Sequence, residues 1–121
     1  MIGSLDVLVI DCPDPRELAR FYSKVLGAEI VGFDEDWAEL VLPGQNRPIV
    51  AFQQVENYNK PQWPTQDVPQ QMHLDVKVDD FDTAEPAVLE LGATKTGSET
   101  PTFRVYLDPA GHPFCLIKPE D

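Results

Sequence analysis

LDPAGHPFC, residues 107–115, lies over LPGQNRPIV, residues 42–50, without a gap when the chain is shifted by 65 residues. Leucine then falls on leucine and proline on proline. The same shift places LGA at 26–28 on LGA at 91–93. Matches at a constant offset indicate an internal repeat. The sequence therefore predicts two tandem copies of one unit of about 50 residues.

A helix is predicted over residues 15–26 of the first copy, because apolar residues recur there with helical spacing. These residues are Leu18, Phe21, Tyr22, Val25 and Leu26. Asp14 has the position of an N-cap, Glu17 completes a capping box, and Gly27 can take the left-handed conformation that ends a helix. A shift of 66 residues places Asp14 on Asp80.

The second copy carries a weaker helical pattern over residues 83–91. Asp82 and Glu85 repeat the capping pattern, and Gly92 follows the segment. Pro86 removes a helical hydrogen bond unless it lies in the first turn. We therefore expect a shorter or distorted second helix.

Apolar segments rich in Val and Ile predict the strands. They span residues 4–11, 28–33, 37–42 and 48–55 in the first copy, and 71–78, 93–97, 103–107 and 114–118 in the second. The predicted fold is α+β, with two tandem βαβββ modules. We expect a single domain over residues 1–121, with module 1 at about 1–56, a connection at 57–70 and module 2 at about 71–121.

Composition argues against several classes of partner. Nine Lys and Arg against 21 Asp and Glu give a net charge of −12, which repels nucleic acid and anionic membranes. No run approaches the roughly 20 apolar residues that span a bilayer, and the N-terminus has no basic segment typical of a signal peptide. We expect a soluble cytoplasmic protein in which Cys12 and Cys115 are free thiols.

Three stretches together resemble the vicinal oxygen chelate (VOC) superfamily, and most closely its glyoxalase and bleomycin-resistance-like group. They are DCPDPRELARFY (11–22), HLDVKVDD (73–80) and VYLDPAGHPFCL (105–116). The resemblance covers nearly the whole chain. It implies that each module curls into a half-barrel and that the two form a cup-shaped incomplete barrel, whose floor can hold a divalent metal.

The resemblance also implies where metal ligands would lie, on the first and last strands of each module. Those positions are Val7 and His73 on the first strands, and approximately Val50 and Cys115 on the last. The two valines have no donor atom, and a catalytic zinc site usually keeps three protein ligands. His112 lies three residues before Cys115, so the two point to opposite faces of a strand. We expect no metal cofactor; the alternative is a divalent metal held by His73 and Cys115.

Side chains alternate along a strand, so His73 and Asp75 share a face and are expected to point into the cup. Asp75 could orient the imidazole of His73, or both could bond neighbouring strands. The apolar lining predicted with them is Val7, Val9, Val50, Phe52, Cys115 and Ile117. An apolar pocket with a few convergent polar groups is the usual makeup of a small-molecule site.

Four further residues complete the predicted ligand site. Arg104 and Tyr106 share a strand face and could supply a cation and a hydroxyl, or could be solvated and packed in the core. Tyr58 and Trp63 lie in the proline-rich connection, which either covers a sheet edge or closes over a ligand.

These observations favour a metal-free glyoxalase-like protein that binds a small apolar or aromatic metabolite, with sequestration or resistance as a role. An alternative is a metal-dependent lyase, isomerase or dioxygenase, so whether the chain is an enzyme stays open. A third reading is a non-catalytic assembly module. We expect a homodimer with a small-molecule ligand, and neither nucleic acid nor membrane as a partner.

Overall fold

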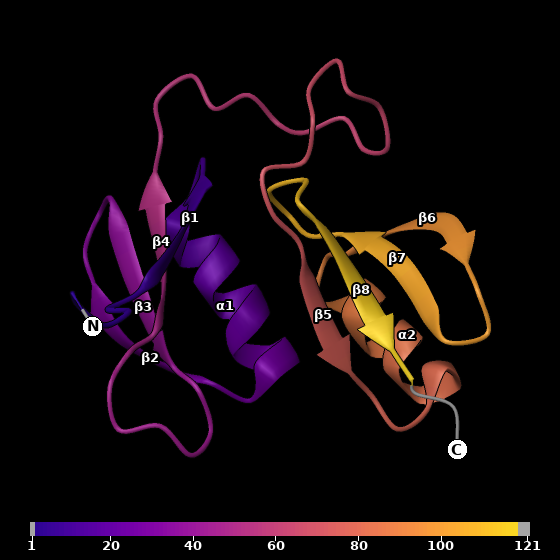
Figure 1. Ribbon diagram of the computed structural model, residues 1–121, viewed down its shortest axis with the longest axis horizontal. Helices are drawn as coiled ribbons and strands as arrows, with labels where there is room; N and C mark the ends of the chain where they lie inside the picture. The colour runs from indigo at the N-terminus through magenta and orange to yellow at the C-terminus, as the bar shows by residue number, and fades with distance from the viewer. Residues whose placement is uncertain (1, 119–121) are drawn as a thin grey trace. The chain divides into compact units, whose positions relative to one another are not determined.

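The chain divides into two compact units, Met1–Tyr58 and Asn59–Asp121, and the computed structural model describes residues 2–118 (Figure 1). The first unit contains β1 (Leu8–Cys12), α1 (Pro15–Leu26), β2 (Glu29–Phe33), β3 (Trp37–Val41) and β4 (Val50–Gln54). The second unit contains β5 (Leu74–Lys77), α2 (Phe81–Glu90), β6 (Thr94–Glu99), β7 (Phe103–Leu107) and β8 (Pro113–Ile117).

The two units have the same topology. Among residues 2–118, the strand order is β1-β4-β3-β2 in one sheet and β5-β8-β7-β6 in the other, and neither sheet closes on itself. In each unit the first strand pairs in parallel with the last, and the remaining pairs are antiparallel. The predicted α+β fold of two βαβββ modules is confirmed. No helix in this part of the chain is long and apolar enough to cross a bilayer.

Helix α1 begins and ends where the sequence predicts. The Asp14 carboxylate accepts hydrogen bonds from the backbone N–H groups of Arg16 (3.0 Å) and Glu17 (3.4 Å), which satisfies donors left open by the first turn. Gly27 ends the helix at φ 65°, a conformation that costs glycine little. Local signals at both ends therefore define this helix.

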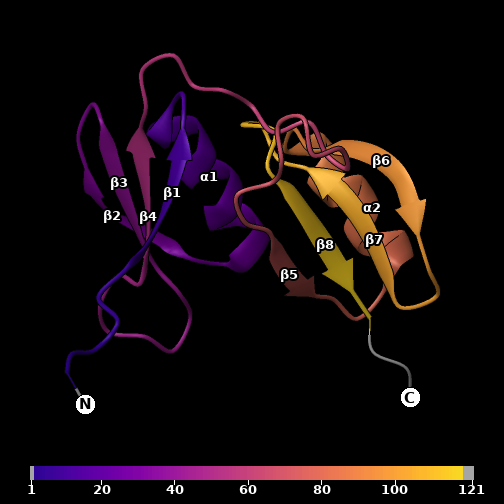
Figure 2. The ribbon, with the colours of Figure 1, turned by 45° about the horizontal axis from the view of Figure 1, so that its top comes forward.

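The apolar face of α1 packs on one face of its sheet (Figure 2). The rings of Tyr22 and Phe52 stack with centroids 5.9 Å apart, and Phe21 meets Tyr22 edge to face at 4.9 Å. Ile10 and Leu40 complete this buried layer from β1 and β3. The core of the first unit therefore lies between α1 and the sheet.

Helix α2 starts earlier than predicted, at Phe81, and its N-cap is Asp80 rather than Asp82. The Asp80 carboxylate accepts from the Asp82 N–H (3.1 Å) and from the Thr83 hydroxyl (2.7 Å). Pro86 then lies inside the helix, beyond the first turn. The helix is shorter than α1, with 10 residues against 12, as expected.

Strand β1 is shorter than the predicted 4–11, because its partner β4 only begins at Val50 opposite Leu8. The preceding carbonyls bond a side chain instead. The Arg47 guanidinium donates to the carbonyl oxygens of Leu5 (2.8 Å) and Asp6 (2.7 Å). Arg47 therefore holds the segment before β1 outside the sheet ladder.

Candidate functional site

A cavity of about 290 Å³ lies on one face of the second unit's sheet. Its lining is Trp63, Gln70, His73, Asp75, Phe103, Val105, Pro113, Cys115 and Ile117. Three strands and the segment before β5 thus contribute to it. The volume is near the lower end of the range for small-molecule sites.

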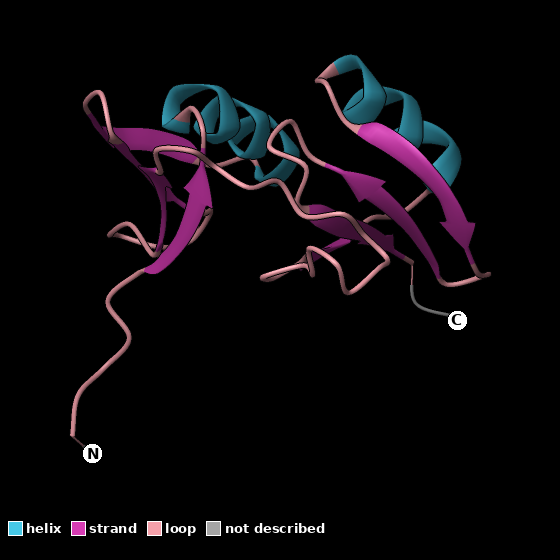
Figure 3. Ribbon diagram, turned by 90° about the horizontal axis from the view of Figure 1, so that it is seen from above, coloured by secondary structure: helices cyan, strands magenta, loops and turns pink. Residues whose placement is uncertain are grey.

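Strand alternation explains which side chains face this cavity. Cys115 of β8 pairs with Asp75 of β5 on one side and with Val105 of β7 on the other, so the three share a face. Their neighbours Phe114 and Leu116 are buried on the opposite face, where α2 lies (Figure 3). The cavity therefore occupies the face of the sheet that α2 does not cover.

The polar groups of the cavity gather at β5. The His73 Nε2 atom lies 3.5 Å from Asp75 Oδ1, and these side chains keep 47% and 57% of their surface exposed. Gln70 adds an amide, and the other lining groups are apolar apart from the Cys115 thiol. The sequence-predicted pair His73 and Asp75 is thus brought together beside apolar walls.

Cys115 is a neutral thiol in this setting. Burial raises the pKa of Cys115 to about 11, and the negative charge and hydrogen bonding of Asp75 add to the effect. A thiolate is the form that binds metals and attacks electrophiles. Cys115 is therefore a packing group rather than a nucleophile.

We expect Cys115 to react slowly with iodoacetamide. A pKa of about 11 leaves roughly one thiol in 1,000 ionised at pH 8, so the rate should be at least ~10-fold below that of an unfolded cysteine peptide. Measuring the rate in a Cys12→Ser background isolates Cys115. Adding Asp75→Asn should raise the rate about 2- to 5-fold, because it removes a negative charge that disfavours the thiolate. A wild-type rate equal to the peptide's would contradict this account.

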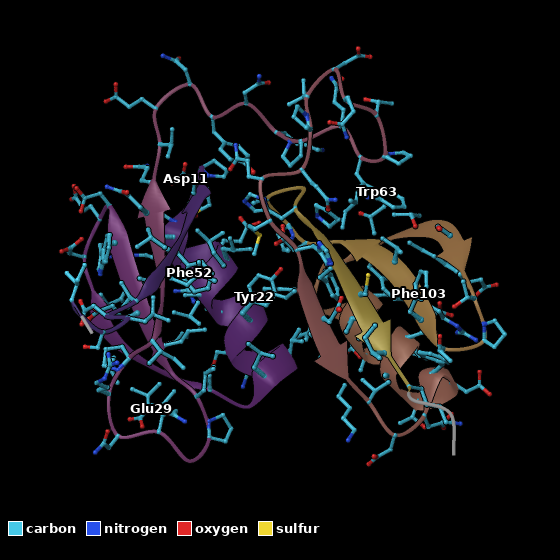
Figure 4. All side chains as sticks on the ribbon, viewed as in Figure 1. Asp11, Tyr22, Glu29, Phe52, Trp63 and Phe103 are labelled. Atoms are coloured by element: carbon cyan, nitrogen blue, oxygen red, sulfur yellow. The ribbon has the colours of Figure 1, made fainter. Side chains whose placement is uncertain are left out.

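The segment before β5 folds back on itself and brings Trp63 to the cavity (Figure 4). The Gln62 N–H donates to the Val68 carbonyl at 2.7 Å, which closes the loop. Lys60 lies over Gly111, whose φ is +88° and where a Cβ atom would come within 2.5 Å of the lysine side chain. Of the two aromatic residues predicted to cover a ligand, Trp63 lines the cavity, whereas Tyr58 belongs to the first unit.

Arg104 and Tyr106 lie on the opposite face of β7 from the cavity. The Tyr106 hydroxyl donates to Glu85 Oε1 of α2 at 2.8 Å, and burial, followed by Glu85, raises the pKa of Tyr106 to about 12. The Arg104 guanidinium lies 3.5 Å from Glu85 and 3.2 Å from Glu99. The structure therefore places this pair in a polar cluster between α2 and the sheet, and Phe103 and Val105 face the cavity instead.

In the first unit the predicted facing of Val50 and Phe52 was wrong. Phe52 stacks on Tyr22 of α1, and Val50 shares its strand face by alternation. Val9 pairs with Ala51 as Asp75 pairs with Cys115, so Ala51 and not Val50 corresponds to Cys115. A slip of one residue moves a whole strand pattern to the other face.

Val7 and Val9 belong to the first unit, and Val7 lies just before β1. Val9 is partly exposed, whereas the next residue, Ile10, is buried against α1. Val9 therefore points away from the helix, as strand alternation predicted. The cavity described above is lined by residues of the second unit.

The donor set does not fit the divalent metal that the family resemblance implied. Ala51, at the last-strand position of the first unit, has no donor, as is also true of Val7, and the Cys115 thiol is protonated. Within residues 2–118 no three His, Cys, Asp or Glu side chains are grouped for a metal ion. His112 is fully buried in the 108–112 turn, where its N–H donates to Asp108.

Several solved structures share this fold. A fosfomycin resistance protein, FosX, from Mesorhizobium loti is 21% identical with a TM-score of 0.68, covering 97% of this chain and 92% of its own. A glyoxalase/bleomycin resistance protein/dioxygenase family enzyme from Burkholderia phytofirmans is also 21% identical, with a TM-score of 0.70 and coverage of 96% and 98%. An integron cassette protein of V. cholerae is 24% identical, with a TM-score of 0.61 and coverage of 99% and 98%.

No curated protein is significantly similar in sequence to this chain. The sequence profile of the glyoxalase-like domain, however, matches residues 7–117, which include both βαβββ units. The chain therefore belongs to the glyoxalase-like domain family.

Proposed function

We propose that the cavity of the second unit binds a small, largely apolar or aromatic molecule without the help of a metal. One observation carries the proposal: apolar side chains of β7 and β8 and the Trp63 indole surround a hollow at whose β5 side the His73 and Asp75 side chains meet. This combination of apolar walls and few polar groups is typical of ligand sites. A role in sequestration or resistance accords with the fosfomycin resistance protein that shares the fold.

The walls supply affinity and the polar groups supply orientation. Trp63 and Phe103 offer flat aromatic surface, and Val105 and Ile117 offer branched aliphatic surface. Each Å² of apolar surface removed from water contributes about 25 cal/mol. The hydrogen-bonding groups at β5 would then fix which end of the ligand enters the cavity.

The two tryptophans of the chain allow a matched test. In a Trp37→Phe variant only Trp63 emits, and we expect 2-phenylethanol and similar neutral aromatic probes to shift its fluorescence in a saturable way. In a Trp63→Phe variant only Trp37 emits, and its emission should stay constant. Cys115→Phe, which fills the cavity, should abolish the response. The proposal fails if millimolar probe leaves Trp63 emission unchanged.

A metal-dependent lyase, isomerase or dioxygenase is the competing function, because His73 retains one metal-binding side chain. Calorimetry of chelator-stripped protein with Mn²⁺, Ni²⁺ and Zn²⁺ separates the two. Stoichiometric binding that His73→Ala abolishes would favour the enzyme. A protein that binds neither metal nor probe would favour the assembly module. The homodimer and the cytoplasmic location stay predictions.

A further inference from the structure

We propose that this cavity selects ligands that carry a positive charge, with the Asp75 carboxylate as the counter-ion. The ligand class is a protonated amine attached to an aromatic or aliphatic body. This inference rests on the proposed function, since it concerns the same cavity. It goes further by assigning the charge of the ligand and the residue that recognises it.

The charges of the lining residues carry the first step. Asp75 has the one permanent charge among them, because no lysine or arginine lines the cavity and His73 is the other titratable polar group. The carboxylate is 57% exposed, so a ligand can reach it without displacing protein side chains. A cation of the ligand would find an acceptor here, and an anion would find a repelling charge.

The cations of the second unit have other positions. Lys95 and Arg104 pair with Glu85 on the helix-facing side of the sheet, with nitrogen-to-oxygen distances of 3.3 and 3.5 Å. Lys60 packs over Gly111. Lys77 follows Asp75 by two residues but lines a separate hollow beside the start of α2. None of these four lysines and arginines is among the cavity's lining residues, so none neutralises Asp75 there.

Cys115 acts as an internal probe of the cavity's electrostatics. After burial, the causes of its raised pKa are the negative charge and hydrogen bonding of Asp75. An anion at the position of this sulfur is therefore disfavoured by the same carboxylate. A carboxylate or phosphonate ligand placed there would meet the same repulsion.

The aromatic walls also suit a cation. Ammonium groups are attracted to the faces of indole and phenyl rings, and Trp63 and Phe103 both line the cavity. The net charge of −12 adds a long-range attraction for cations that salt screens. Near and distant charges thus favour the same class of ligand.

Three probes of one shape test the proposal: 2-phenylethylamine, 2-phenylethanol and phenylacetate, titrated into the full chain at pH 7.4 and followed by ligand-observed NMR. We expect the amine to bind about 3- to 10-fold more tightly than the alcohol, and phenylacetate more weakly than either. The preference should shrink in 0.5 M NaCl, because Asp75 is half exposed.

Asp75→Asn should remove the preference, so that amine and alcohol bind equally while the alcohol affinity stays unchanged. Asp79→Asn is the matched control, since it removes the same charge from a residue outside the cavity lining. Equal binding of amine and alcohol to the native protein, or a preference that survives in Asp75→Asn, would overturn the inference. Either result leaves the proposed function standing if the alcohol binds. Failure of both amine and alcohol would instead refute the proposed function.

Discussion

Replacing Phe52 with alanine should lower the free energy of unfolding by about 3–5 kcal/mol. The Phe52 side chain is fully buried and stacks on Tyr22 with the ring planes 4° from parallel. Truncation removes the apolar contact between β4 and α1 and leaves a cavity that the surrounding residues can only partly fill. Urea unfolding measures the loss as a lower midpoint at an unchanged slope.

Phe33→Ala is the matched control, because it makes the same chemical change at a partly exposed site. Phe33 is 45% exposed and lies under the Arg16 guanidinium, 4.6 Å from the ring centroid. We expect a loss of about 0.5–1 kcal/mol there. If the two variants lost equal stability, Phe52 would not lie between helix and sheet, and its predicted place in a ligand site would have to be reconsidered.

The helices show where local sequence signals suffice. The cap at Asp14 and the glycine at position 27 define α1 because each forms its bonds within a few residues. In α2 the Asp82 and Glu85 pattern imitated a capping box, although Glu85 accepts the Tyr106 hydroxyl instead. The 66-residue shift that placed Asp14 on Asp80 contained the correct start.

Strand facing depends on pairing between distant residues, and the sequence constrains it less. The turn before β4 joins the paired residues Leu40 and Val50, whereas the turn before β8 joins Tyr106 and Phe114 over a shorter stretch. A gapless alignment of the two turns therefore cannot hold within the strands. The error moved the expected facing of β4 by one residue.

The site divides along the same line. Alternation within β5 and β8 placed His73, Asp75, Cys115 and Ile117 on one face, and the structure brings these four to the cavity. Phe103 and Val105 were missed, because polar character drew attention to their neighbours on β7. Gln70 and Pro113 were also missed. Gln70 reaches the cavity through the fold of a loop, for which the sequence carries no periodic signal.

Replacing Asp108 with alanine is the second change with a large expected effect, a loss of about 2–5 kcal/mol in the free energy of unfolding. One carboxylate oxygen, Oδ1, accepts the N–H groups of Ala110 (2.9 Å) and His112 (3.0 Å). Both donors and the carboxylate are buried, so alanine would leave two backbone N–H groups without this acceptor. Urea unfolding again gives the measurement.

Asp108→Asn separates the hydrogen bonds from the charge, because the amide keeps an oxygen that can accept both N–H groups. We expect it to lose only about 1 kcal/mol, the difference between a charged and a neutral acceptor. Equal losses in the alanine and asparagine variants would show that the turn depends on the charge rather than on the two bonds.

The same pair of variants connects this turn to the cavity. Asp108 fixes the path of residues 109–112, which places Gly111 beneath Lys60 and starts β8 at Pro113 in the cavity wall. Loosening the turn should therefore disturb the wall and the loop that carries Trp63. In a Trp37→Phe background, Asp108→Ala should weaken the response of Trp63 to 2-phenylethanol, and Asp108→Asn should preserve it. A full response in a destabilised Asp108→Ala protein would mean that the cavity forms independently of the turn.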